Sequence, residues 1–513
     1  MAKGSDLPNE LLVKIAGLVH PASIIDFAVA SHRLLEISND RLALHRETAQ
    51  SRKVMDTQRG YPASVFGPRP QPPDQDEWAV CVRRALEQPH KAWYVQTLVI
   101  RCNSDSIHRV QPSESTPSNQ QVSKMAREEN LLVYRRSLEE LRTAMDPKIF
   151  ETLYNALALQ QTHLLNSLLL QYLPNLTKII WDDQHPTTAS PLAIMMEAIA
   201  RNPVPLVLCR LVIVEFGNSG SGVGNPVPFS CLQSSLQIPT VRLIRARRIA
   251  WDQRHALSVP QKSSNVIVID LTHQDFCLKG TNMLSLISAT NPAGHSDVHA
   301  MGFEELIAAP RTLIKLTIVA SPTQRNASHD IPSAERLITT LSKHTNDSLE
   351  SLSIRAGHTA IAVLPYLSSF TKLKFLETEP CLLFSTLELN SIIAINKLPL
   401  KLEHLRLYDD PFLFFDDVVT LLTTLLSYKR TFPRWRQLDL GLDDGRQVND
   451  RTGISHYMHK LADKVQVSCA RKDVNFRTKF RTDGVADAVW DQEGGGEWWR
   501  QQGRNPATDP FFT

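Results

Sequence analysis

Residues 402–407 read Leu-Glu-His-Leu-Arg-Leu, with apolar side chains at the first, fourth and sixth positions. In an extended strand successive side chains point to opposite faces, so the fourth and sixth positions share one face. The pattern therefore indicates a short strand with one buried face. It returns along the chain at Val95/Leu98/Ile100, Leu176/Ile179/Trp181, Leu208/Leu211/Ile213, Val266/Ile269/Leu271, Leu313/Leu316/Ile318, Leu349/Leu352/Ile354 and Trp435/Leu438/Leu440, with weaker copies that begin at Val241 and Leu373.

Helical patterns separate several of these copies. From Leu176 onward the first positions lie 24 to 47 residues apart, which leaves room for one helix and two connections in each unit. Apolar residues recur at helical spacing in 191–201, 334–344 and 417–427. Units this small bury their apolar faces only by stacking on one another. The sequence thus predicts an α/β solenoid, a curved parallel sheet backed by helices, and the alternative is a doubly wound α/β domain.

This repeating pattern resembles an irregular leucine-rich-repeat array. In such an array the side chains between the buried positions of each strand point to the concave face, which is suited to contact with a protein partner. The residues expected to contact a target protein are Arg245, Arg247, Arg355, Glu377, His404, Arg406 and Tyr408, and the same face is expected to carry Lys178, Arg210, Lys315, Glu379, Gln437 and Asp439.

The first fifty residues carry a different pattern, typical of three short helices. Asp6 and Pro8 open the first helix, Ser23 with Asp26 predicts a capping box for the second, and Ser31 predicts the cap of a third, short helix. A unit of about forty residues cannot bury all its apolar positions, so some must contact a partner. The apolar stripe of the first helix consists of Leu7, Leu11, Ile15, Leu18 and Val19.

Together these helices resemble an F-box. The resemblance rests on Leu7-Pro8, Glu10-Leu11-Leu12, Ile15, Val19, Pro21, Ser23-Ile24 and the Ser-His-Arg-Leu run at 31–34. Many F-boxes have Phe where this chain has Ala16, and a Trp near Leu34, whereas the first Trp here is Trp78. The resemblance implies adaptor-binding residues, which are Leu7, Pro8, Leu11, Leu12, Ile15, Val19, Ile24 and Ile25.

An F-box implies a role in an SCF-type ubiquitin ligase. Its helices would bind the adaptor subunit and, through it, the cullin, while the repeats hold an unknown protein target. The chain itself would have no catalytic role and no cofactor. A second reading is a repeat scaffold outside any ligase, in which the helices only cap the repeats. A third is an α/β enzyme with unrecognised catalytic residues, which a closed pocket of convergent His, Asp or Ser groups would favour.

Composition divides the chain into segments. We expect an F-box-like domain at 1–55, a Pro-rich linker at 56–76, a repeat domain at 77–470 and a C-terminal extension with a flexible tail at 471–513. Within the repeat domain, residues 103–128 are rich in Ser, Gln, Pro and Asn and predict a disordered insertion.

Charge, hydropathy and cysteine spacing argue against nucleic-acid binding, a membrane span, a disulfide framework and a zinc clip. A net charge of +3 over 513 residues is too weak to predict nucleic-acid binding, and no apolar run is long enough to predict a membrane span. The seven cysteines lie at least 21 residues apart, which fits neither a disulfide framework nor a zinc clip. With no secretory signal pattern in the sequence, we expect an intracellular protein of the cytoplasm or nucleus.

Motifs for catalysis or metal binding are incomplete. The glycine-rich run 217–224 lacks the third glycine of a dinucleotide loop, and Pro226 follows where a helix should begin. His295 with His299, and His456 with His459, have helical spacing but lack a third ligand. We therefore predict no metal site.

Overall fold

The computed structural model describes residues 7–21, 23–56, 77–102, 128–129, 131–140, 142–143, 147–158, 169–170, 172–183, 209–217, 227–247, 249–250, 260–274, 304–320, 334–355, 367–383, 398–408, 415–443 and 463–481. Contacts divide the chain into two units, Met1–Val241 (unit 1) and Arg242–Thr513 (unit 2). The Pro-rich stretch from 57 to 76, the insertion from 103 to 127 and the tail from 482 onward lie outside the described residues.

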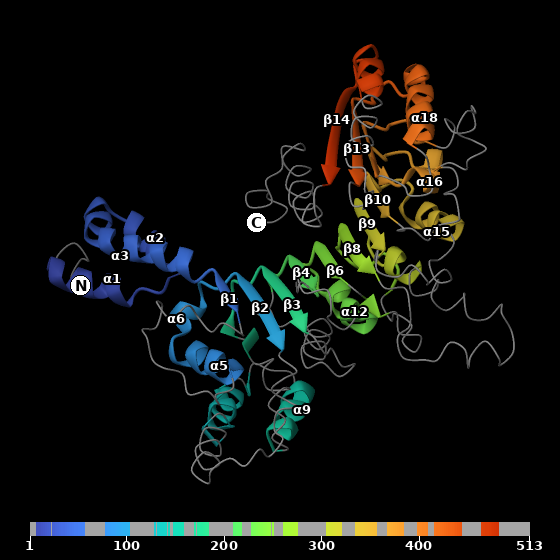
Figure 1. The fold of residues 1–513 in the computed structure, drawn as a ribbon. Coiled ribbons are helices and arrows are strands. Elements are labelled where there is room, and N and C mark those ends of the chain that lie inside the picture. Colours follow the sequence, from blue (N-terminus) through green and yellow to red (C-terminus); the bar gives the residue numbers. More distant parts are fainter. Residues whose placement is uncertain are drawn as a thin grey trace, which may run out of the picture. The chain divides into compact units, whose positions relative to one another are not determined.

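Both units contain helices and strands (Figure 1). Unit 1 contains α1 (Asn9–Leu18), α2 (Ile24–Val29), α3 (His32–Ser51), β1 (Val54–Asp56), α5 (Glu77–Glu87), α6 (Pro89–Ala92), β2 (Thr97–Cys102), α9 (Pro147–Ala158), β3 (Lys178–Asp183), β4 (Ile213–Phe216), β5 (Val227–Pro228) and α12 (Phe229–Gln237). Unit 2 contains β6 (Leu243–Arg247), β7 (Ile249–Ala250), β8 (Val268–Gln274), β9 (Lys315–Ala320), α15 (Ala334–Thr345), β10 (Ser351–Arg355), η4 (Leu367–Ser369), β11 (Phe375–Thr378), α16 (Pro380–Leu383), β12 (His404–Tyr408), α18 (Phe415–Ser427), η5 (Lys429–Thr431), β13 (Gln437–Asp443) and β14 (Asn475–Arg481).

Each unit is built on parallel strands that lie side by side in chain order. The order is β1-β2-β3-β4 in unit 1 and β6-β8-β9-β10-β11-β12-β13-β14 in unit 2. Neighbours within each unit pair in parallel. A doubly wound sheet reverses its strand order at a switch point, whereas stacked repeats keep the chain order. The predicted α/β fold with a parallel sheet is confirmed, and its order is consistent with a solenoid.

The same pair of backbone hydrogen bonds joins the starts of neighbouring strands. The Lys374 carbonyl accepts bonds from the backbone N–H groups of Glu403 at 2.8 Å and His404 at 3.0 Å. The Glu403 carbonyl then accepts from Arg436 at 2.8 Å and Gln437 at 3.1 Å. Since one carbonyl positions the start of the next strand each time, the strands behave as equivalent repeating units. Other carbonyls that accept two bonds in this way belong to Lys53, Gln96, Thr177, Arg242, Ile267, Ile314 and Glu350.

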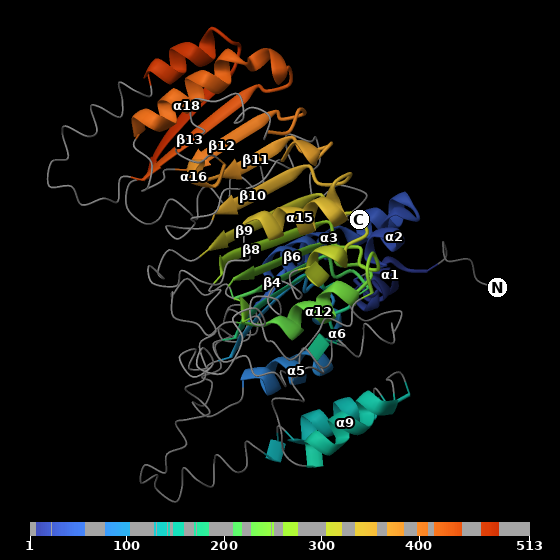
Figure 2. The same cartoon turned by 90° about the vertical axis from the view of Figure 1, so that its right-hand side faces the viewer.

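The apolar positions of the repeats form the core. All three apolar side chains of the 402–407 copy are fully buried. Burial of a leucine side chain stabilises a fold by about 1.5–3 kcal/mol, so the stacked strands contribute much of the stability. In unit 2, α15 and α18 lie on one side of the strands (Figures 1 and 2). These two helices confirm the patterns at 334–344 and 417–427, while 191–201 lies outside the described residues.

One copy of the repeat was predicted in the wrong frame. The buried apolar side chains of this copy are Leu211, just before β4, and Val214 and Phe216 within it. Ile213, predicted as the third apolar position, pairs instead with Lys178, beside the row of buried residues. Both frames satisfy the spacing because apolar residues recur every three positions here, so only the strand register separates them.

Two strands and one helix differ from the expectations. β1 follows α3 after two residues and pairs with β2, so the expected boundary at residue 55 falls within a strand. β14 lies in the segment expected to be a C-terminal extension and pairs with β13. The third helix was expected to be short, but α3 has 20 residues. None of the helices that the structure describes is both long and apolar enough to cross a bilayer.

Candidate protein-binding site

Polar contacts assemble the three N-terminal helices. Arg33 at the start of α3 donates from Nε and Nη2 to the side-chain oxygen of Asn9 at 3.0 and 2.7 Å, and from Nη2 to the carbonyl of Leu7 at 2.7 Å. The Ser31 hydroxyl accepts a bond from the Leu34 N–H at 3.2 Å, which confirms the predicted cap. Ser23 makes no side-chain cap bond, so the capping box predicted for α2 is wrong. α1 and α3 are thus joined at their N-terminal ends.

Helix α1 carries two apolar stripes. Leu12 and Ala16 are buried, because they face the neighbouring helices. Leu11, Ile15 and Leu18 are 44%, 38% and 87% exposed. These three residues, spaced four and three apart, form a continuous face of the helix, here called the α1 stripe. Exposed apolar residues scattered singly are ordinary, whereas a contiguous stripe marks a surface for a partner.

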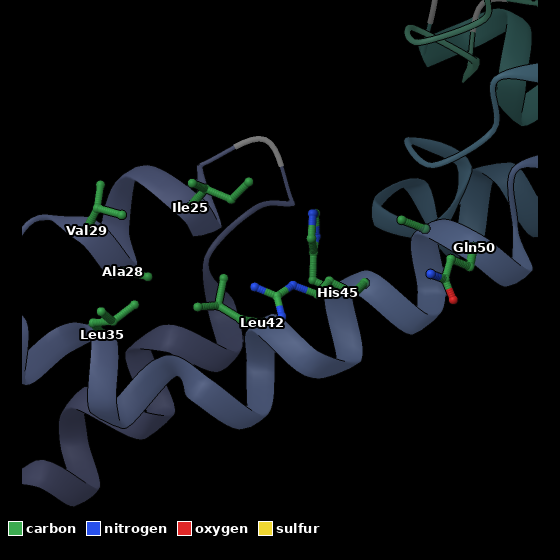
Figure 3. Close-up of a pocket in the computed structure, with 9 residues that line it drawn as sticks. Ile25, Ala28, Val29, Leu35, Leu42, His45 and Gln50 are labelled. Atoms are coloured by element: carbon green, nitrogen blue, oxygen red, sulfur yellow. The ribbon is translucent and has the colours of Figure 1, made fainter. Parts of the chain in front are cut away.

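A groove of about 470 Å³ lies between α2 and α3. It is referred to below as the α2–α3 groove. Ile25 and Val29 of α2 are 54% and 66% exposed, and Leu35 of α3 is 43% exposed. In Figure 3 the side chains of Leu35, Leu42 and His45 stand along α3 on the side of Ile25. The groove is lined by Ile25, Ala28, Val29, Leu35, Leu42, His45, Arg46, Ala49 and Gln50.

The residues expected to bind the adaptor fall into three groups. Pro8, Leu11, Ile15 and Ile25 are exposed, whereas Leu7 and Val19 are half-buried. Leu12 and Ile24 are buried, so they support the helices and do not face solvent.

The sequence reasoning missed Val29, Leu35 and Leu42, which line the groove. Ile25 and Val29 lie four residues apart, and this spacing within the second helix was the available signal.

Aromatic and imidazole rings join the helices to the start of the sheet. His45 Nδ1 and the Tyr94 hydroxyl are 2.8 Å apart, and the His45 ring lies 6.3 Å from that of Trp93. The His20 ring approaches Trp93 edge-on at 6.0 Å. Burial, and then the charge of Arg46, lower the pKa of His45. The helices therefore pack on the segment that leads into β2, and are not simply tethered to it.

Three of the residues expected to contact a target lie in one polar network of unit 2. Arg406 donates to Asp439 Oδ2 from Nε at 3.3 Å and Nη2 at 3.2 Å, and from Nη1 to Glu377 Oε2 at 3.4 Å. His404 Nε2 donates to the same Asp439 oxygen at 2.7 Å. Gln437 Nε2 donates to Asp439 Oδ1 at 2.9 Å. These groups already hydrogen-bond one another, so their contact with a target stays a prediction.

The network sets the charge of Asp439. Burial alone would raise the pKa of this carboxyl, but the hydrogen bond and charge of His404, the bond from Gln437 and the charge of Arg406 lower it to about 2. Burial also disfavours the charged form of Arg406, yet the charges of Glu377 and Asp439 contribute to a raised pKa. The Arg406 guanidinium lies 5.4 Å from the centre of the Phe375 ring, which adds a cation–π contact.

The remaining predicted target residues lie on other parts of the strands. Arg245 of β6 pairs with Asp270 of β8 at 3.0 Å. Tyr408 packs against Gly441, where an added Cβ would lie 3.1 Å from its ring. Arg247 and Arg355 lie in β6 and β10, and their side chains are outside the described residues.

Metal-binding geometry is missing from the described part of the chain. There, no three His, Cys, Asp or Glu side chains are placed to hold a metal ion. The pairs His295 with His299 and His456 with His459, and all but the first residue of the 217–224 run, lie outside the described residues.

Comparison of the chain with protein-family models, curated proteins and solved structures finds no match. The features of the structure that bear on function are the α1 stripe, the α2–α3 groove and the polar network around Arg406 and Asp439 in unit 2.

Proposed function

We propose that this protein is a non-catalytic substrate-recognition subunit of an SCF-type ubiquitin ligase. The α1 stripe carries the proposal, since it leaves Leu11, Ile15 and Leu18 in solvent on a helix whose other side is buried. Removing such a stripe from water favours association by roughly 25 cal/mol per Å² of apolar area buried. The adaptor subunit would cover the stripe and connect the chain to the cullin.

The strands of unit 2 would hold the protein target. Their polar face carries Arg406, Glu377, Arg245 and Asp270 in cross-strand ion pairs. The subunit would act by proximity, because holding a target lysine near the charged ubiquitin-conjugating enzyme raises its local concentration. We expect this complex in the cytoplasm or nucleus.

A pull-down with the full chain from cells with inhibited ligase activity tests the proposal. Mass spectrometry should recover the adaptor and cullin with the wild type and lose both with the double variant Ile15→Glu/Leu18→Glu. Both residues are exposed, so the substitutions should change the free energy of unfolding by no more than about 0.5 kcal/mol each. Leu132→Glu, at another exposed leucine of unit 1, is the matched control and should keep both partners.

Unaltered recovery with the double variant, or no adaptor with the wild type, would count against the ligase role. A thermal melt of each variant confirms that the fold is retained.

A specific observation favours a second function, that of a repeat scaffold capped by its N-terminal helices. β1 follows α3 after two residues and pairs with β2, and His45 contacts Tyr94. A cap that stabilises the sheet needs no ligase adaptor. Recovery of other proteins without adaptor or cullin, unaffected by Ile15→Glu/Leu18→Glu, would favour this function.

A further inference from the structure

The α2–α3 groove has an apolar end and a polar end. Ile25, Val29, Leu35 and Leu42 supply aliphatic side chains, whereas His45, Arg46 and Gln50 lie further along α3. Arg46 is the one charged residue among the nine that line the groove, and no carboxylate lines it. An occupant therefore needs aliphatic groups at one end and groups that accept hydrogen bonds from a cation at the other.

Further positive charge lies around Tyr94, which His45 contacts. Arg52 is buried directly after α3, and Lys91 belongs to α6, just before Trp93 and Tyr94. His45 contacts both of these aromatic residues. Lys91 and Arg52 are close enough for the charge of Arg52 to lower the pKa of Lys91, after burial as the main cause.

His90 shows the same crowding of like charges. Burial, and then Lys91, Arg52 and His20, lower its pKa. The charges that perturb His45, His90 and Lys91 are thus all cations or imidazoles. Like charges this close repel one another, so an anion placed nearby would be attracted.

We propose that the α2–α3 groove binds an acidic amphipathic segment of a partner protein. Its aliphatic side chains pack against Ile25, Val29 and Leu42, and its carboxylates face Arg46. A helix that places aliphatic residues at positions i, i+3 or i+4, and i+7 fits a groove between two helices. This inference shares one premise with the proposed function, namely that the N-terminal helices form a surface for a partner. It adds the chemistry of the partner segment that binds there.

An unbiased selection tests the proposal. A displayed library of random helical peptides is selected on the full chain and counter-selected on Val29→Arg, which fills the groove at an exposed position. The peptides that bind the wild type but not Val29→Arg are sequenced. We expect aliphatic residues at helical spacing and an excess of Asp and Glu over Lys and Arg.

The best peptide is then measured against charge variants. Arg46→Glu should weaken its affinity about tenfold, and raising the salt from about 50 to about 500 mM should weaken it further, because exposed ion pairs are screened. Arg434→Glu, at an exposed arginine of unit 2, is the control and should leave the affinity unchanged. A thermal melt of Val29→Arg and Arg46→Glu checks that both variants fold.

Groove-dependent peptides with neutral or basic character would overturn the inference, as would a failure to select any groove-dependent peptide. Acidic binders together with an unsuccessful adaptor pull-down would uphold the groove chemistry and reject the ligase role. Recovery of the adaptor, together with basic groove-binding peptides or with none, would uphold the ligase role and reject the groove chemistry.

Discussion

Arg406 brings two guanidinium nitrogens to a single oxygen of Asp439, with Nε at 3.3 Å and Nη2 at 3.2 Å from Oδ2. The two residues lie on neighbouring strands, β12 and β13, in directly paired positions. The side chain of Asp439 is 3% exposed and that of Arg406 is 12% exposed. Removing one charge from such a buried pair leaves the other without compensation.

We expect Arg406→Met to destabilise unit 2 by about 3–5 kcal/mol, because Asp439 and Glu377 would lose a buried cation while Asp439 would keep its bonds from His404 and Gln437. Hydrogen exchange of the β11–β13 peptides measures the local opening. Arg434→Met, at an exposed arginine nearby in sequence, should change exchange very little. Equal protection in Arg406→Met and wild type would show that the pair contributes no net stability.

Acid should selectively weaken the same network. The pKa of Asp439 is depressed to about 2 in the folded protein, so its ionised form stabilises the fold above its unfolded pKa of about 4. This contribution, about 2 kcal/mol, is lost as the pH falls from about 4 to about 2.

The comparison with Asp439→Asn isolates this contribution from the other carboxyl groups. At neutral pH the variant should be less stable than the wild type, and the difference should shrink towards zero near pH 2. Urea unfolding at a series of pH values provides the measurement. A difference that does not depend on pH would contradict the assigned ionisation.

The stability lost on replacing a leucine of the repeat with alanine should depend on how deeply that leucine is buried. Leu405 is fully buried in β12, whereas Leu400, five residues earlier, is 62% exposed. Leu405→Ala should destabilise the protein by about 2–5 kcal/mol through lost burial and a cavity. Leu400→Ala should cost no more than about 0.5 kcal/mol. Denaturant unfolding compares the two, and similar costs would mean that the 402–407 strand is not packed as described.

Cysteine reactivity should follow burial in the native protein. Burial raises the pKa of the Cys469 thiol to about 12, so almost no thiolate forms at pH 8. Cys209 is exposed. Iodoacetamide at pH 8, followed by peptide mass spectrometry, should label Cys209 within minutes and leave Cys469 unmodified until denaturant is added. Comparable labelling of the two cysteines without denaturant would contradict the packing around Cys469.

Much of the fold was predictable because its signals are local. The spacing of apolar residues within six positions located the strands around Leu405 and Leu438, and helical spacing located α15 and α18. The β4 copy was placed wrongly, since two frames satisfy the same spacing. β1 and β14 were missed, because Arg52 stands where the pattern expects an apolar residue before β1, and Asp473 stands at the matching position before β14.

The candidate site was predictable only in part. The α1 stripe follows from the spacing of Leu11, Ile15 and Leu18, although periodicity could not tell the exposed stripe from the buried one with Leu12. The side of α1 that is covered depends on how α3 packs against it. This packing is made by residues that are distant in sequence. The α2–α3 groove has the same origin, as Ile25 and Leu42 come from different helices.

The amino-acid sequence by itself determined where the regular repeat strands and the helices α15 and α18 form, because alternation and helical spacing are properties of neighbouring residues. Tertiary structure alone decided which polar groups met. Arg406 and Asp439 are 33 residues apart, and His45 and Tyr94 are 49 apart. Parallel stacking aligns the first pair, and the packing of α3 on the segment before β2 aligns the second. Long-range register and helix packing depend on the whole buried surface, which no short sequence pattern contains.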